Sequence, residues 1–333
     1  MLLRALLAAW NDTLPLAVFL DSRARKLLEL PMGTKVFWVN ASVSSRLKAE
    51  FRLRKMVRAR DTLLCFHNLP PLLPSVARVV VFQQNRILLG NNSLFQFAWK
   101  ARLRITCERF INHMFRHRVS EYIVQTPTMQ RDLLQWYSAA GRSRAPTVNV
   151  LPFFDTIAGA NVPGEFSHEW DFIYVADGEA HKNHRVLLEA WRLLAQEGLY
   201  PSLALTLTSR DDPLKLEVEA ARAKVGLNIF NLGKLHRERV IELYKRTRAM
   251  IFPSTSESFG LPLIEATQLG VPILAPELDY VRDVCSPMHT FDPSSAISVA
   301  RAVKRFLGCP EPVLSLRAPE EFWCELLQQN ISV

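Results

Sequence analysis

The sequence lacks any run of about eighteen apolar residues, the length that an α-helix needs to cross a bilayer. Its longest uncharged stretch, residues 62–77, contains prolines, a histidine and an asparagine, which a lipid-exposed helix would not hold together. We therefore expect no membrane-spanning segment. The opening residues MLLRALLAAWND carry no small-residue cleavage pattern, so they predict a first amphipathic helix and not a secretory signal.

Cysteine is also scarce, and its spacing excludes two classes of site. The five cysteines are odd in number, and no two of them form a C-x-x-C pair that would hold zinc or carry out redox chemistry. We interpret them as reduced, buried thiols of a cytoplasmic protein. His181 and His184 are three residues apart, but no third ligand is near them in the sequence, so we expect no metal site there either.

Acidic residues are few in the first half of the chain. Residues 1–150 contain 23 lysines and arginines against 8 acidic residues, a net charge of +15, whereas the remainder carries −6. The basic half predicts an anionic partner, for which a phospholipid surface, a pyrophosphate-linked acceptor and nucleic acid are the alternatives. With 49% hydrophobic and 22% charged residues, the whole has the composition of an ordinary globular protein.

The length of 333 residues and the order of apolar patterns predict two domains. Short apolar runs typical of buried strands alternate with helical patterns, which indicates parallel α/β layers. Strands are expected at residues 16–20, 35–39, 62–66, 79–82, 122–124 and 148–151, and again at 172–175, 204–208, 229–232, 249–252 and 273–275. Helices of the second half are expected at 183–196, 213–224, 237–246, 261–269, 294–307 and 318–329.

A turn-rich stretch, residues 155–170, predicts a linker between two Rossmann-like domains. We place the first domain at residues 1–152 and the second at 153–312. A final helix over 313–333 is expected to pack back toward the first domain.

The most specific pattern lies at residues 252–266, FPSTSESFGLPLIEA. A strand is expected to end at Phe252, and Pro262 suits the first turn of the following helix because its missing N–H would be unpaired there anyway. The backbone N–H groups of residues 259–261 would then point off a helix N-terminus, where Gly260 lets an anion come close. This geometry suits a pyrophosphate.

Two glutamates flank that expected anion site. Glu257 precedes the helix and Glu265 lies one turn inside it, so each carboxylate could accept hydrogen bonds from sugar hydroxyls. Taken singly, each glutamate is equally well explained as a solvated surface residue.

A second pattern follows the strand expected at residues 172–175. Lys182 would lie at the carboxyl end of that strand, where open α/β sheets bind ligands, and its ammonium could meet a phosphate. Asn183 is a reasonable cap for the next helix, whose buried face would consist of Leu187, Leu188, Trp191 and Leu194. Considered without the glutamate pattern, Lys182 is better explained as a solvated loop lysine than as a phosphate ligand.

Together, these two patterns resemble retaining glycosyltransferases of the GT-B fold, in the large family 4 of sugar-nucleotide-dependent transferases. The residues from Glu257 to Glu265 are similar to the E-x7-E motif of that family, and Lys182 to the lysine after the first strand of its second domain. The resemblance covers residues 150–333 well and the first domain only in strand order and local patterns.

The resemblance implies roles for individual residues. Glu257 and Lys182 are expected to be catalytic, with Glu257 orienting the donor sugar and Lys182 meeting the diphosphate. The residues expected to bind the donor are Glu265 at the ribose, Ser258, Phe259, Gly260, Leu261, Lys234 and His181. His67, Gln84 and Asn85 are expected on the acceptor side. The chain has no D-x-D sequence, so we expect a nucleotide-diphosphate sugar as donor and no metal or other cofactor.

Three departures from the family stand out. Ala176 occupies the position of a frequent clamp arginine, for which His181, Arg210 and Lys234 are candidate replacements. The sequence begins within the expected first helix, so the first domain is expected to lack its first strand and the glycine-rich loop after it. Amides follow the strand at 79–82 where relatives carry a histidine.

Residues 95–118 combine six lysines and arginines with aromatic residues. They fit a role at an anionic membrane surface, and equally a core helix with a solvated basic face.

The resulting hypothesis for the whole protein is a hexosyltransferase, peripheral on the cytoplasmic face of the membrane. It would act on an oligosaccharide or lipid-linked acceptor in the synthesis of lipopolysaccharide, O-antigen or another cell-surface polysaccharide. Two alternatives stay open: a catalytically inactive GT-B binding or scaffold subunit, and a nucleic-acid-binding protein. The sequence has no recognised motif for the last, and we expect no nucleic-acid partner.

Overall fold

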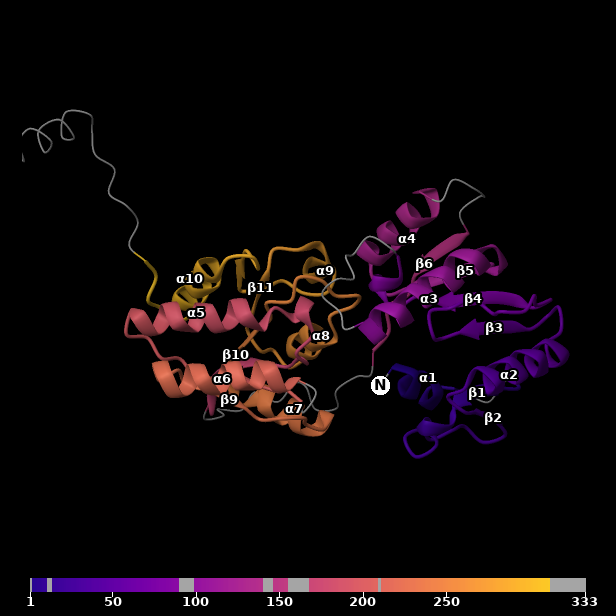
Figure 1. Ribbon diagram of the computed structural model, residues 1–333, viewed down its shortest axis with the longest axis horizontal. Helices are drawn as coiled ribbons and strands as arrows, with labels where there is room; N and C mark the ends of the chain where they lie inside the picture. Colours follow the sequence, from indigo (N-terminus) through magenta and orange to yellow (C-terminus); the bar gives the residue numbers. More distant parts are fainter. Residues whose placement is uncertain are drawn as a thin grey trace, which may run out of the picture.

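The computed structural model describes residues 2–10, 14–89, 99–139, 146–154, 168–208 and 211–311. The chain forms two α/β units built on parallel strands, as Figure 1 shows. Three of the expected features lie outside the described residues: Arg210, the helix over 313–333, and most of the linker.

The second domain is built on a six-stranded sheet in the order β12-β11-β10-β7-β8-β9, in which every pair is parallel. Its strands are β7 (Trp170–Tyr174), β8 (Leu203–Leu205), β9 (Ile229–Asn231), β10 (Thr247–Ile251), β11 (Ile273–Pro276) and β12 (His289–Phe291). Its helices are α5 (His184–Gln196), α6 (Asp212–Val225), α7 (Arg237–Lys245), α8 (Leu261–Gln268), α9 (Asp279–Arg282) and α10 (Ala296–Phe306). The strand order reverses between β7 and β10, which makes their carboxyl ends the topological switch point of the sheet.

Helix α5 shows why this sheet is covered. Its apolar residues recur with helical spacing, and Leu187, Leu188, Trp191 and Leu194 are all at most 2% exposed, as predicted. The helix lies between α10 and α6 (Figure 1). Trp191 packs edge-on against Phe172 of β7 and donates its indole N–H to a backbone carbonyl, so its polar atom is satisfied within the core.

The first domain contains two separate parallel sheets. The larger has the order β3-β4-β5-β6 and consists of β3 (Thr62–Cys65), β4 (Arg78–Phe82), β5 (Glu121–Val124) and β6 (Thr147–Val150). The smaller pairs β1 (Ala17–Asp21) with β2 (Lys35–Val39). The helices are α1 (Leu2–Ala8), α2 (Val43–Met56), α3 (Trp99–Phe115) and α4 (Pro127–Ala139).

The sequence predicted a Rossmann-like first domain but not this division of its strands into two sheets. All six expected strands are present, but within the described residues β1 and β2 pair only with each other. The hydrophobic cluster around the larger sheet contains no residue before Leu63. Strand pairing is a long-range property, so the alternation of strands and helices could not reveal the break.

Two elements of the second domain were not predicted, β12 and α9. They contain three and four residues, which is too short for a hydrophobic period to be recognised. Helix α9 nevertheless matters for the arrangement of the domains, because it faces α4 of the first domain (Figure 1).

The two domains meet through polar contacts. The Thr128 N–H at the start of α4 donates to Asp283 Oδ2 at 2.9 Å, so a carboxylate of the second domain satisfies an unpaired amide at a helix N-terminus of the first. Arg131 donates to Asp279 Oδ2 at 2.7 Å. These contacts fix the first domain against α9, beside the carboxyl ends of the second sheet.

Candidate functional site

The candidate site is built where the loops after β7 and β10 leave the sheet together. The two strands are parallel neighbours, so their carboxyl ends lie side by side. The Thr255 N–H donates to the His181 carbonyl at 2.8 Å, and the Ser254 hydroxyl donates to the same oxygen at 3.1 Å. The loop of Lys182 and the loop of Glu257 are therefore bound to each other through the backbone.

Asn183 reinforces this connection in a way that the sequence did not predict. Its side chain makes no capping hydrogen bond, because the residue adopts a left-handed conformation with φ of 61°. The amide instead donates to the carbonyls of Pro253 and Pro293, at 3.1 and 2.6 Å. Asn183 therefore stands at the predicted N-cap position of α5, but its side chain ties three loops together instead of capping the helix.

Lys182 and Glu257, the two residues predicted to be catalytic, lie in contact. Lys182 Nζ donates to Glu257 Oε1 at 2.7 Å, and the two side chains are 18% and 13% exposed. Tyr174, at the end of β7, donates its hydroxyl to the Lys182 carbonyl at 2.8 Å, which fixes the backbone of that residue. A partly desolvated ammonium is thus held at the switch point, where it can exchange its carboxylate partner for an anionic ligand.

The start of α8 supplies backbone donors close to Glu257 in the sequence. Gly260 precedes the helix with φ of 71°, and Leu261 and Pro262 form the first turn. The N–H groups of Phe259, Gly260 and Leu261 make no hydrogen bond to any described residue. Anion binding by these groups stays a prediction.

Glu265 is paired with a cation that the sequence analysis missed. Arg237, the first residue of α7, donates from Nε to Glu265 Oε1 at 3.1 Å, and the side chains are 26% and 12% exposed. From the sequence, an arginine at the start of a polar helix is expected to be solvated. The pair with Glu265 is recognised only in the folded structure. Arg237 is a further candidate for the cation that Ala176 does not supply.

The other predicted donor residues lie in different surroundings. His181 is 17% exposed, and burial followed by the charge of Lys182 lowers its pKa, which favours a neutral ring. Lys234 lies in the loop between β9 and α7, and its predicted contact with the donor stays a prediction. Ser258 accepts a hydrogen bond at Oγ from the backbone N–H of Arg86, at 3.1 Å.

Through that contact the first domain touches the loop between β10 and α8, here called the donor loop. Arg86 follows β4, and its Nε donates to Asp132 Oδ2 at 2.5 Å. The residues just before it, Gln84 and Asn85, were predicted on the acceptor side, and both donate their backbone N–H to Asn68 Oδ1. Gln84 also donates its side-chain amide to the Phe66 carbonyl at 3.0 Å. The loops after β3 and β4 therefore form one unit that touches the donor loop through Ser258.

His67 lies in the same unit and is bound to a cation. Its Nε2 lies 2.6 Å from Arg46 Nη2, so this nitrogen accepts from the guanidinium and the imidazole is neutral. Desolvation of the ring, and then the charge of Arg46, lower the pKa of His67, although the residue as a whole is exposed. Its placement on the acceptor side stays a prediction.

His184, the first residue of α5, makes the stability of the protein depend on pH. It is 3% exposed, its ring centre lies 4.7 Å from that of Tyr174, and neither ring nitrogen has a hydrogen-bond partner among the described residues. Burial lowers its pKa to about 4 from the usual 6.5, despite the opposing charge of Asp211.

We expect acid to destabilise the protein through His184. Between pH 6.5 and 4 the unfolded chain binds a proton at this residue and the native state does not, so the free energy of unfolding falls by up to about 3 kcal/mol as pH decreases. Urea denaturation at several pH values would measure the free energy of unfolding. In the His184→Leu variant, the part of its pH dependence that comes from His184 should be absent. An unchanged pH dependence in the variant would contradict the assignment.

Neither a membrane span nor a metal cluster is found in the parts of the chain that the structure describes. No helix there has the length and hydropathy needed to cross a bilayer. No group of three His, Cys, Asp or Glu side chains there could hold a metal ion.

A family model matches the second domain, and proteins of known activity match part of the chain. Residues 160–318 match the family model described as glycosyl transferases group 1. The serotype-specific mannosyltransferase WbdA of Escherichia coli is 31% identical over 172 residues, which cover 49% of this chain and 21% of that protein. The O-antigen chain mannosyltransferase B of Escherichia coli is 31% identical over 114 residues, 34% of this chain and 30% of that protein. The chain therefore spans less than a third of the length of these relatives.

A solved structure extends the likeness to both domains. The complex of Anabaena Alr3699/HepE with UDP superposes with a TM-score of 0.60 at 16% identity, covering 92% of this chain and 85% of the other. An identity this low establishes the fold alone. The fold is therefore GT-B, and residues 160–318 of the chain are similar to the glycosyl transferases group 1 family.

Proposed function

We propose that the chain transfers a hexose-type sugar, with retention of configuration, from a nucleotide-diphosphate sugar to a saccharide acceptor. The observation that carries the proposal is the Lys182–Glu257 ion pair, 2.7 Å long and largely desolvated, beside the free amides at the start of α8. This arrangement offers an ammonium and backbone donors to a diphosphate, and a carboxylate to sugar hydroxyls.

The proposed reaction uses these groups as charge develops. As the bond between the sugar and the diphosphate breaks, Lys182 and the amides of residues 259–261 stabilise the departing anion. Glu257 orients the donor sugar while the sugar becomes oxocarbenium-like, and Glu265 with Arg237 holds the ribose. The acceptor attacks the face that the diphosphate leaves. No protein nucleophile and no metal ion take part in the proposed step.

The names of the relatives support a cell-surface polysaccharide as the product. One acts in O-antigen chain synthesis by its name, and another is serotype-specific. We propose an oligosaccharide or lipid-linked acceptor presented at the cytoplasmic face of a membrane, with the basic first domain toward the lipid. The net charge of +15 over residues 1–150 supports that orientation.

Binding followed by turnover tests the proposal. Calorimetric titration with UDP-, GDP- and ADP-sugars should identify one donor, and the protein should then hydrolyse or transfer that sugar. Glu257→Gln should abolish turnover. Glu217→Gln is the matched control, because Glu217 is also paired with a cation, Arg185, but on an exposed part of α6.

Two outcomes separate the alternatives. Binding of a sugar nucleotide without any turnover by the native chain would favour an inactive binding subunit with the same fold. Failure to bind any sugar nucleotide would contradict the proposed donor class altogether.

A further inference from the structure

We infer that the outward face of α3 binds an anionic lipid bilayer. The inference deepens the proposed function by naming the surface that meets the membrane. Its test uses vesicles without a sugar donor, so the membrane contact and the transferase activity can each fail alone.

The outward face of α3 is apolar. Five residues, at steps of four, four, three and four, form one stripe along the helix, since an α-helix has 3.6 residues per turn. They are Trp99, Leu103, Cys107, Phe110 and Met114. The exposed fractions are 64% for Trp99, 59% for Leu103, 64% for Phe110 and 48% for Met114, and Cys107 is exposed as well. At 1.5 Å per residue the stripe is about 22 Å long.

Different residues attach α3 to the domain. Ile105 and Asn112 are 4% and 0% exposed, and they lie on the opposite side of the helix from the stripe. Arg109 donates from Nε to the Ile87 carbonyl at 2.9 Å. The helix therefore buries a narrow face and leaves its wider apolar face uncovered by the described chain, which decides against the core-helix interpretation for those residues.

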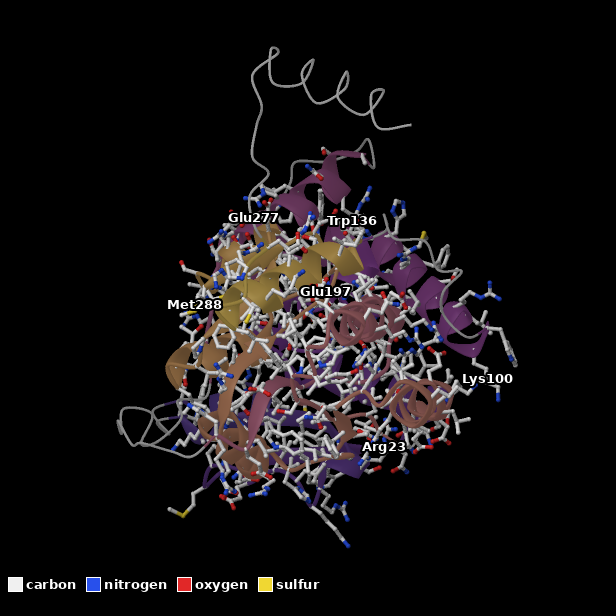
Figure 2. All side chains as sticks on the ribbon, turned by 90° about the vertical axis from the view of Figure 1, so that its left-hand side faces the viewer. Arg23, Lys100, Trp136, Glu197, Glu277 and Met288 are labelled. Carbon is white, nitrogen blue, oxygen red and sulfur yellow. The ribbon has the colours of Figure 1, made fainter. Side chains whose placement is uncertain are left out.

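Cations flank the stripe on both sides. Lys100 and Arg104 follow one edge by helical position, and Arg102 the other. Lys100 lies at the edge of the molecule (Figure 2), and the side chain of Arg104 is 72% exposed. Lys100 Nζ also lies 5.5 Å from the centre of the Trp99 ring.

This combination favours lipid over protein as the occupant. Lysine and arginine beside an apolar stripe can reach phosphate headgroups while the stripe enters the acyl boundary, and tryptophan is suited to that depth. The surrounding domain adds a strongly positive field, which attracts an anionic leaflet. Helix α2 also exposes apolar residues, Leu47 and Phe51 among them, but its stripe covers two turns and contains no tryptophan.

Flotation with vesicles tests the inference. The full chain should float with phosphatidylcholine vesicles that contain phosphatidylglycerol, and much less with phosphatidylcholine alone. The double variant Leu103→Ser/Phe110→Ser should bind at least about tenfold more weakly, because two large apolar side chains no longer enter the lipid. Lys100→Gln should weaken binding about fivefold, the equivalent of about 1 kcal/mol for one basic residue at the surface.

The matched control carries the same two substitutions on α2. Leu47→Ser/Phe51→Ser removes one leucine and one phenylalanine that are 40% and 55% exposed in the same domain, and should leave vesicle binding within about twofold. Brominated lipid should quench the fluorescence of the native chain more than that of Trp99→Phe. Donor hydrolysis in solution should be unchanged in all of these variants.

Three results would overturn the inference. The first is equal loss of vesicle binding in the α2 and α3 double variants. The second is native-like vesicle binding by the α3 double variant together with a lower melting temperature, which would mean that the chain itself covers the stripe. The third is native-like vesicle binding together with a smaller particle mass, which would mean that a second copy covers it.

Discussion

Replacing Lys182 by methionine is expected to lower the rate of sugar transfer about 10²–10³-fold, the effect of removing one preorganised donor to a developing anion. The ammonium is 18% exposed and has Glu257 as its carboxylate partner at 2.7 Å, so methionine removes a partly desolvated donor from the site. The substitution also leaves a carboxylate that is 13% exposed without its partner, which should cost about 1–3 kcal/mol of unfolding free energy. Steady-state kinetics and urea denaturation measure the two effects.

A double variant separates catalysis from stability. Lys182→Met/Glu257→Gln removes both charges, so it should regain much of the lost stability while remaining inactive. Lys215→Met provides the control: Lys215 is also paired with a carboxylate at 2.9 Å, but on the exposed surface of α6, and its loss should leave the rate within about twofold. A fully active Lys182→Met protein would disprove the proposed diphosphate contact.

The positions of the strands could be predicted because their apolar runs are local. Each expected strand overlaps an observed one, and the turn residues Gly260 and Pro262 placed the start of α8 correctly. What the sequence could not provide was the order of the strands. Because β10 pairs with β7, two distant loops meet, and this pairing brings Lys182 to Glu257, 75 positions later in the chain.

The missed features are those that depend on a distant partner. Arg237 has an ordinary environment until α7 packs beside α8, and Asn183 looks like a helix cap until Pro253 and Pro293 approach it. Ser258 was predicted to bind the donor, and nothing in the sequence links it to Arg86. Periodicity and capping describe the residues within a few positions of each other, so contacts between domains lie beyond their reach.

Replacing Gly260 by alanine is the second substitution with a large expected effect. Its φ of 71° is strained for a residue with a Cβ, at about 1–2 kcal/mol, and the added atom would lie 3.2 Å from Leu263 Cδ1. Relief of the backbone strain would move the amides of residues 259–261, which form the proposed diphosphate site. We expect donor affinity to fall about 10–100-fold, since the strain and displaced donors together correspond to one or two factors of ten in an equilibrium constant. Calorimetry with the sugar nucleotide measures this directly.

Gly270, at the other end of α8, isolates the contribution of the anion site. It has nearly the same strain, with φ of 68°, but an added Cβ would meet nothing within 4 Å. Gly270→Ala should therefore lose a similar free energy of unfolding and keep native donor affinity. If both variants weakened donor binding equally, the effect would come from general destabilisation of α8. A loss confined to Gly260→Ala would mean that the amides at the helix start bind the diphosphate, because strain alone is common to both positions.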